Sequence, residues 1–114
     1  MIKVIGGSGF VGSFLIEELK EFEVTNLDKN PSPLFSEISI IGNILNKNDL
    51  NFERNTSTVV LLAAEHRDDV SPTSLYYDVN VLGTKNVLKA MDKSRVKNLV
   101  FTSSVAIYGL NKEN

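Results

Sequence analysis

Residues 1–12 constrain the fold more than any other part of the chain. Apart from Lys3, the run Ile2–Ile5 is apolar and β-branched, and it has the length of a buried strand. Glycines interrupt this run, and apolar residues then return at helical spacing: Phe10, Phe14, Leu15 and Leu19. A strand, a glycine turn and a helix in this order form a phosphate-binding device, because bare backbone N–H groups and the positive end of the helix dipole face one point.

Three glycines in this turn follow the spacing G-x-x-G-x-x-G. We expect Gly6 to allow a sharp turn, Gly9 to let a pyrophosphate approach the backbone, and Gly12 to let the helix pack on the strand. The alternative is a glycine-rich turn that binds nothing. The context of strand, turn and helix favours binding.

Size and composition narrow the classes of protein. A chain of 114 residues suits one domain, residues 1–114, with a real core. The net charge of −2 argues against a nucleic-acid partner or an anionic membrane surface. Cysteine is absent and the single histidine, His66, has no partner at metal-ligand spacing, so no metal site is expected. No apolar run approaches the ~18 residues of a membrane span, and no leader pattern opens the chain. A cytoplasmic location is therefore expected.

The rest of the chain alternates between strand and helix patterns. The first helix is expected to extend to Lys20, with its four apolar residues facing a sheet. Further strands are expected over residues 23–27, 36–41, 58–62 (continued by Ala63 and Ala64) and 97–102, with a helical turn over 46–52. A long helix is expected to begin at Ser71-Pro72 and to end near Met91, with Val81, Thr84, Leu88 and Met91 on one stripe. This alternation predicts an α/β fold with an open, mostly parallel, twisted sheet of about five strands.

Asp28 carries a further expectation. Asp28 ends the second strand, where a carboxylate can accept hydrogen bonds from the adenosine ribose and favour NAD over NADP. The alternative is a solvated aspartate in the turn 28–31.

Gly83 lies within the long helix, where it costs about 1 kcal/mol relative to alanine, which indicates close packing on the sheet. The helix also carries Asn80 and Asn86, for which exposure on the polar face is the simplest interpretation.

With these motifs in order, the chain resembles the extended short-chain dehydrogenase/reductases, and among them the NAD-dependent nucleotide-sugar epimerase/dehydratase family. The motifs are the glycine turn, Asp28, the alanine pair 63–64, the helix segment 77–87 and the serine segment 101–109. The resemblance implies a Rossmann-type, doubly wound sheet that binds NAD. The cofactor-binding positions it implies are Gly6, Gly9, Phe10, Val11, Gly12, Asp28, Asn43, Ile44, Leu62, Ala63, Ala64 and Asn80. It also implies a catalytic serine, Ser104, and a nucleotide-sugar substrate of a full-length parent.

The chain departs from the family pattern at two points. Asn43 stands where the family usually has an aspartate that accepts from the adenine amino group. Asparagine keeps one acceptor oxygen, so binding can survive with weaker charge assistance. The family's Y-x-x-x-K pair, which supplies the tyrosine base, is missing from these residues, because Tyr108 belongs to the serine segment and Lys112 matches the spacing only superficially. Loss of such a base costs ~10²–10⁴ in rate, so we expect the 114 residues alone to be inactive.

Other functions stay open from the sequence. A non-catalytic NAD-sensing or partner-binding domain would need the same turn without the catalytic pair. A methyltransferase also places a glycine loop after its first strand, but the serine and alanine pairs fit it poorly. A fragment that binds nothing is the third alternative. Since no helix pattern follows the strand 97–102, part of one sheet face is expected to be uncovered, which favours either a homo-oligomer or one piece of a longer protein.

Overall fold

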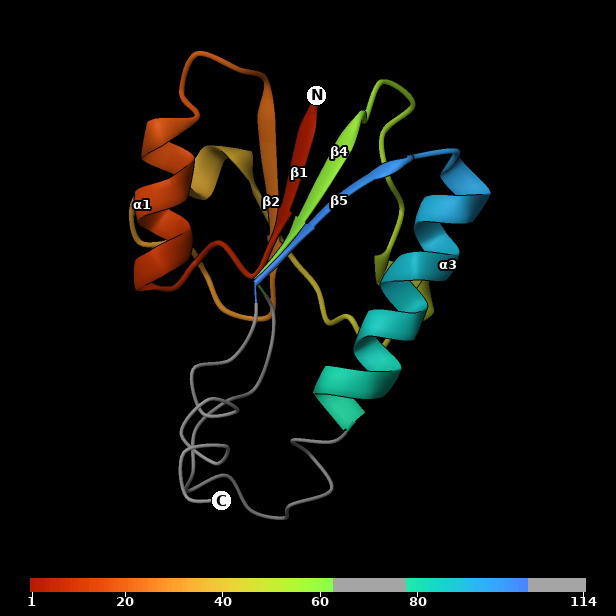
Figure 1. Cartoon of the computed structure of the whole chain (residues 1–114). Helices are drawn as coiled ribbons and strands as arrows, with labels where there is room; N and C mark the ends of the chain where they lie inside the picture. The colour runs from red at the N-terminus through yellow and green to blue at the C-terminus, as the bar shows by residue number, and fades with distance from the viewer. Residues whose placement is uncertain (63–77, 103–114) are drawn as a thin grey trace, which may run out of the picture.

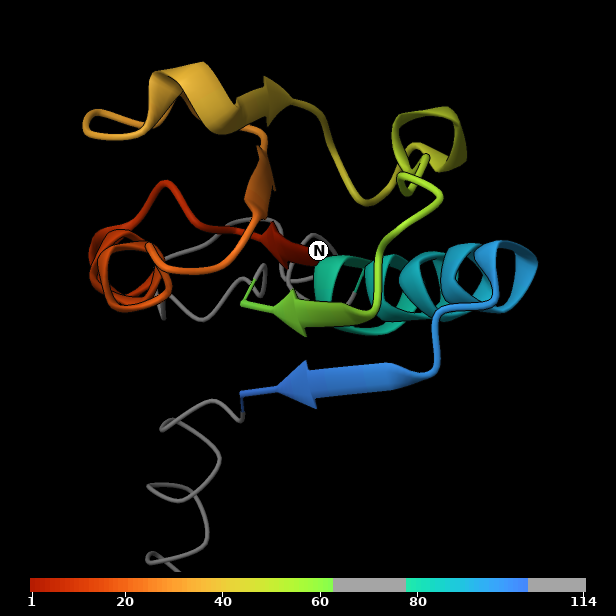
Figure 2. The ribbon, with the colours of Figure 1, turned by 90° about the horizontal axis from the view of Figure 1, so that it is seen from above.

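The computed structural model describes residues 1–62 and 78–102, and these residues form a five-stranded sheet. Its strands are β1 (Ile2–Ile5), β2 (Val24–Asp28), β3 (Ser39–Ile41), β4 (Thr58–Leu61) and β5 (Asn98–Phe101). The spatial order is β3-β2-β1-β4-β5, and every neighbouring pair is parallel. Figure 2, viewed from above, shows the strands side by side in this order. The predicted parallel α/β architecture is confirmed.

Helices cover both faces of the sheet. Helix α1 (Phe10–Glu18) lies on one side, and α3 (Thr84–Ser94) lies on the other (Figure 1). The side chains of β1 alternate between the two layers: Val4 packs with Ile16 of α1, and Ile5 belongs to the core under α3. Because the central strands are buried on both faces, their sequences are almost continuously apolar.

The inward face of α1 matches the predicted stripe only in its second half, where Leu15 and Leu19 are partly buried against the core. Phe10 and Phe14 expose 89% and 66% of their surface, whereas Gly12 and Ile16 are buried. The helix also ends at Glu18 and not at Lys20. The reason lies at Gly12, which sits against the backbone of Gly7 and so fixes which side of the helix turns inward.

The expected strand over 36–41 is only half a strand. Residues Ser36–Ile38 form a 3-10 turn (η1), and β3 begins at Ser39. Two serine side chains explain the difference, because they bond to the backbone and close a local turn. The Ser39 hydroxyl donates to the Phe35 carbonyl at 2.7 Å, and the Phe35 N–H donates to Ser32 Oγ at 3.0 Å. A second 3-10 turn, η2 (Lys47–Asp49), lies within the predicted helical turn 46–52.

Helix α3 also buries only part of the predicted stripe. It is preceded by a π-helical segment, η3 (Asp78–Gly83), and it ends at Ser94. Val87 and Met91 are buried, but Leu88 is 47% exposed. Gly83 packs on the side chain of Ile44, which follows β3, and not on a strand, since a Cβ at Gly83 would clash with that side chain. The expected cap at Ser71-Pro72 lies outside the described residues.

Strand β5 is the edge of the described sheet and is poorly covered. Val100 and Phe101 each expose 51% of their surface. The expectation of an uncovered strand near the end of the chain is therefore confirmed. Among the described helices, none combines the length and the apolar composition that crossing a bilayer would need.

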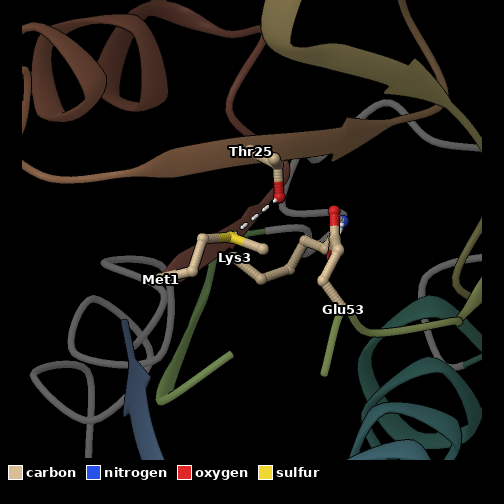
Figure 3. A network of polar contacts seen from close by, with 4 residues as sticks. All are labelled: Met1, Lys3, Thr25 and Glu53. Carbon is tan, nitrogen blue, oxygen red and sulfur yellow. Dashed lines mark hydrogen bonds and ion pairs between the residues drawn. The ribbon is translucent and has the colours of Figure 1, made fainter. Parts of the chain in front are cut away.

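An ion pair between a buried lysine and a partly exposed glutamate lies at the amino end of the sheet (Figure 3). Lys3 on β1 exposes only 2% of its side chain, and its ammonium lies 3.0 Å from Glu53 Oε1 and 3.4 Å from Oε2. The neighbouring Thr25 hydroxyl donates to Met1 Sδ at 3.5 Å. Burial by itself would raise the pKa of the Glu53 carboxyl, but its own backbone N–H, Lys3 and Thr25 together hold the pKa below its ordinary value.

Candidate functional site

The site is built on the glycine turn between β1 and α1. The Gly6 N–H donates to the Leu27 carbonyl at 2.8 Å, so the chain leaves β1 still bonded to β2. Gly6 has a φ of 90°, which a residue with a side chain rarely adopts. The predicted need for glycine at this sharp turn is confirmed.

The other glycines of the turn have unlike surroundings. A Cβ on Gly7 would clash with the side chain of Asn26, and a Cβ on Gly12 would clash with the backbone of Gly7. The sequence predicts that Gly12 lets the helix pack on the strand. In the structure Gly12 packs on the turn itself, against the backbone of Gly7. A Cβ on Gly9, in contrast, would have nothing within 4 Å. The turn is close-packed on its inner side and open at Gly9.

The open side faces the beginning of α1. Gly9 precedes the helix in an extended conformation (φ −81°, ψ −175°) and supplies no side-chain cap, and the first turn contains no acidic residue. The first N–H groups of a helix have no acceptor within the helix. They therefore favour an anion at this point, together with the helix dipole.

Asp28 is tied to the glycine turn. Its Oδ2 accepts from the Ser8 N–H at 2.9 Å, and its Oδ1 accepts from the Asn30 N–H at 2.9 Å. The Ser8 hydroxyl completes the connection by donating to the Asn30 carbonyl at 2.8 Å. A carboxylate oxygen can accept more than one hydrogen bond, so Asp28 keeps acceptor capacity beyond these two contacts. The aspartate at the end of β2 thus belongs to the turn and is not only part of the solvated loop 28–31.

Asn26 belongs to the same cluster, although the sequence analysis did not identify it. Its side chain is 0% exposed and accepts from the Gly7 N–H at 2.9 Å. The signal in the sequence was a polar amide within an otherwise buried strand, two residues before Asp28. A buried amide without partners would be costly, so its presence indicated partners that the strand pattern alone could not name.

The predicted adenine-side residues are only partly available to a ligand. Asn43 is exposed, and its Oδ1 accepts from the Leu45 N–H at 2.9 Å. Ile44 is 5% exposed and its side chain belongs to the core, so it can meet a cofactor only through its backbone. The Ile44 carbonyl accepts from Asn86 Nδ2 at 2.9 Å. Asn86 therefore links α3 to this loop by a hydrogen bond. The expectation that Asn86 is exposed on the polar face of the helix was wrong, because its side chain is partly buried.

The remaining predicted site residues divide into two groups. Phe10 and Val11 are 89% and 65% exposed at the start of α1, and Leu62 is partly buried beyond the end of β4. Asn80 lies in η3. Ala63, Ala64 and the predicted catalytic Ser104 lie outside the described residues, as does His66. Within the described part of the chain, no group of three or more histidine, aspartate or glutamate side chains could hold a metal ion.

The parallel sheet and the open glycine turn define the class of a dinucleotide-binding α/β domain. Comparison with known proteins gives the particular family: residues 2–114 match the NAD-dependent epimerase/dehydratase family, and the chain belongs to it.

Two relatives and one solved structure illustrate the match. The chain is 58% identical over 115 residues to N-acetyl-alpha-D-glucosaminyl-diphospho-ditrans,octacis-undecaprenol 4-epimerase of Escherichia coli O157:H7, covering 99% of this chain and 35% of that protein. It is 35% identical over 125 residues to UDP-glucose 4-epimerase of Lactobacillus helveticus, covering 98% and 38%. The structure of UDP-glucose 4-epimerase from Bifidobacterium longum in complex with NAD+ and UDP matches with a TM-score of 0.81 and 28% identity, covering 95% and 38%. The chain thus spans little more than a third of the length of these proteins.

Proposed function

We propose that residues 1–114 form one NAD-binding domain, with the diphosphate of the cofactor at the glycine turn. The observation that supports this most directly is the contrast within the turn, where Gly7 and Gly12 are close-packed and Gly9 faces open space. A turn with a purely structural purpose would not need the bare backbone at Gly9, because the conformation of Gly9 suits other residues. Asp28, bonded to the Ser8 N–H, is placed to bind the adenosine ribose.

The described residues fit such a cofactor. The first N–H groups of α1, from Phe10 onward, would donate to the diphosphate, and the backbone near Asn43 and Ile44 would meet the adenine. When bound, the nicotinamide supplies the acceptor and donor of hydride for the family's chemistry. The chain's own part is to hold the diphosphate and the ribose at fixed positions. Leu62, Ala63, Ala64 and Asn80 are proposed to line the remainder of the cofactor site.

The substitution Gly9→Ser tests the proposal. Serine is a favoured N-cap residue, so the folded chain should be as stable as the original or slightly more stable. Its Cβ would occupy the open space, and its hydroxyl would compete for the N–H groups that the diphosphate needs. We expect the dissociation constant for NAD, measured by isothermal titration calorimetry, to rise about tenfold or more, which is the effect of losing one good hydrogen bond to a charged group.

The matched control is Glu18→Ser, which introduces the same side chain at the exposed far end of α1. This variant should bind NAD like the original chain. Equal NAD affinity for Gly9→Ser and the original chain would contradict the assignment of the turn to the diphosphate. If the original chain fails to bind NAD at all, the cofactor proposal fails as a whole.

We propose further that the domain is the cofactor-binding portion of a sugar epimerase or dehydratase, with Ser104 holding the reacting oxygen. Because the tyrosine and lysine of the Y-x-x-x-K pair are missing from the 114 residues, the chain alone should not turn over a sugar substrate. Epimerisation above background by the purified chain would refute this. The alternative is a non-catalytic NAD-sensing domain, which would bind NAD equally well but would give no activity in any longer protein.

The identity to the relatives favours a second candidate for the substrate. The chain is 58% identical to an epimerase of a lipid-linked, diphosphate-bound N-acetylglucosamine but 35% identical to a UDP-glucose 4-epimerase. A parent enzyme could therefore act on a sugar attached to undecaprenyl diphosphate instead of a nucleotide sugar. Incubation of that enzyme with each substrate in turn, followed by analysis of the product sugars, would distinguish the two.

The uncovered strand β5 supports a proposal on assembly. Val100 and Phe101 expose half of their surface on the edge strand of the described sheet, and such edges favour association. We expect a homo-oligomer through this face. Sedimentation of the chain at micromolar concentration should show a species larger than the monomer, and Phe101→Glu should shift it toward the monomer.

A further inference from the structure

Asn26 is the buried side chain at the glycine turn to which the proposed function assigns no contact with the cofactor. It lies on β2, faces α1, and exposes 0% of its surface. An amide inside a strand lowers the stability of the fold unless its polar atoms find partners. The partners of Asn26 therefore indicate its role.

All of these partners belong to the turn or to β3. The Asn26 Oδ1 accepts from the Gly7 N–H at 2.9 Å. Its Nδ2 donates to Ser8 Oγ at 3.3 Å and to Ser39 Oγ at 3.0 Å. The Ser39 hydroxyl in turn donates to the Phe35 carbonyl at 2.7 Å, which anchors the amide on the β3 side. One side chain thus connects the glycine turn to two neighbouring strands.

The hydrogen bond to Gly7 sets the orientation of a peptide group. Gly7 is buried and its N–H points to the buried side chain of Asn26. Ser8 is held from two directions, because its hydroxyl contacts Asn26 and its N–H donates to Asp28. Without the Asn26 amide, the Gly7 N–H would lose its acceptor inside the protein and the turn would lose its support from beneath.

We propose that Asn26 is a positioning residue for the cofactor. It holds the Gly7–Ser8 segment in the binding conformation before the diphosphate arrives, and it does so without touching the cofactor. A binding loop that is already ordered loses less conformational freedom on binding, so the affinity is higher. This inference rests on the proposed NAD site, but its first consequence, an ordered Gly7 N–H, is independent of any ligand.

Two variants of the full 114-residue chain test the proposal, each with two measurements. The measurements are amide hydrogen exchange at Gly7 without ligand and titration with NAD. Asn26→Leu replaces the amide by an apolar side chain of similar size and so removes the acceptor. We expect exchange at Gly7 to become about tenfold faster or more and NAD to bind about tenfold more weakly, as for the loss of one buried hydrogen bond.

Asn26→Asp keeps the shape and the acceptor oxygen. Exchange at Gly7 should stay slow in this variant, while the negative charge beneath the turn weakens NAD binding. The matched control is Val24→Ala, a core substitution on the same strand and the same face. It should lower the unfolding midpoint in urea without changing exchange at Gly7 or the affinity for NAD.

The outcomes separate the inference from the proposed function. If folded Asn26→Leu protects Gly7 and binds NAD like the original chain, the inference is wrong. If the original chain does not bind NAD, the proposed function fails, and exchange at Gly7 alone then decides whether Asn26 orders the turn. Should Asn26→Leu fail to fold, Ser39→Ala takes its place, because it removes the anchor of the amide outside the turn. Faster exchange at Gly7 in Ser39→Ala supports the inference, and unchanged exchange overturns it.

Discussion

The two ends of the sheet both hold polar side chains, but these side chains find different kinds of partner. At the amino end, the buried Lys3 ammonium lies 3.0 Å from the Glu53 carboxylate, so two side chains of opposite charge face each other. At the carboxyl end, Asn26 and Asp28 bond to backbone N–H groups of the glycine turn under the α1 layer. The first arrangement is closed, whereas the second leaves the space at Gly9 open. At the carboxyl end the polar side chains hold a backbone segment in place, whereas at the amino end two charged side chains neutralise each other. This difference distinguishes the end that we propose binds the cofactor.

The largest expected effect is at the carboxyl end. In Gly12→Val the added side chain would meet the backbone of Gly7, which has no rotamer to change. Overpacking of this kind costs about 3 kcal/mol of unfolding free energy, at the upper end of the usual range. Urea denaturation followed by circular dichroism would measure it. Unchanged stability would show that α1 can shift away from the turn, and the contrast between a tight Gly12 and an open Gly9 would lose its meaning.

The next effect is at the amino end, where Glu53→Ala leaves the buried Lys3 ammonium without its partner. Breaking a fully buried pair costs about 3–5 kcal/mol, but Glu53 exposes 37% of its side chain, so we expect about 2 kcal/mol. Lys3→Met is the matched variant, because the remaining carboxylate can be hydrated, and it should cost less than about 1 kcal/mol. NAD affinity should stay unchanged in both. Equal losses in the two variants would contradict the view that Lys3 is the buried partner.

The strands were predictable from sequence because burial on both faces leaves a simple signal. Apart from Lys3 and Thr58, the segments Ile2–Ile5 and Thr58–Leu61 are apolar, and the structure places both in the centre of the sheet. The stripe on α1 was not predictable in the same way. Phe10 and Phe14 follow helical spacing, but the contact that orients the helix is made by a residue without a side chain, Gly12. Hydrophobic periodicity does not register such a contact.

The sequence analysis identified the residue whose place at a strand end marks it, and it missed the residue whose partners lie on other segments of the chain. Asp28 was identified from its place at the end of a strand, and the structure brings it to Ser8. Asn26 was missed because its partners, Gly7 and Ser39, lie on other segments that only the fold brings together. The 3-10 turn over Ser36–Ile38 was missed for a related reason, since the Ser39 hydroxyl bonds to the nearby Phe35 carbonyl and this local turn overrides a β-branched pattern.

A third prediction concerns the charge at the carboxyl end. Asp28→Asn keeps one acceptor oxygen but loses the negative charge and one of the two contacts to backbone N–H groups. We expect NAD to bind about tenfold more weakly, as for the loss of one hydrogen bond to a charged group. The preference for NAD over NADP should also narrow, because the carboxylate no longer repels a 2′-phosphate. Titration with both cofactors measures it, with the exposed Asp92→Asn as control. An unchanged ratio of the two affinities would remove Asp28 from the ribose site.

The smallest expected effect is the pH dependence of the amino end. The pKa of the Glu53 carboxyl lies below its ordinary value of 4.5 in the folded chain, because burial, which raises it, is outweighed by its backbone N–H, Lys3 and Thr25. Between the folded and the ordinary pKa the unfolded chain binds more protons, so stability rises with pH there. The contribution of Glu53 is therefore complete above about pH 4.5 and is lost as the pH falls through the lower, folded value.

Unfolding free energies of the original chain and of Glu53→Gln, measured in urea from pH 7 to 3, isolate this contribution. The difference between the two should be constant above about pH 4.5, the ordinary value, and should shrink below it. In the Lys3→Met background the same comparison should vary less with pH, since one of the groups that lower the pKa is gone. The effect is modest because water reaches 37% of the Glu53 side chain. If the difference in unfolding free energy grew as the pH fell, desolvation of the Glu53 carboxyl would outweigh its attraction to Lys3. The contrast between the ion pair at the amino end and the open glycine turn would then be lost.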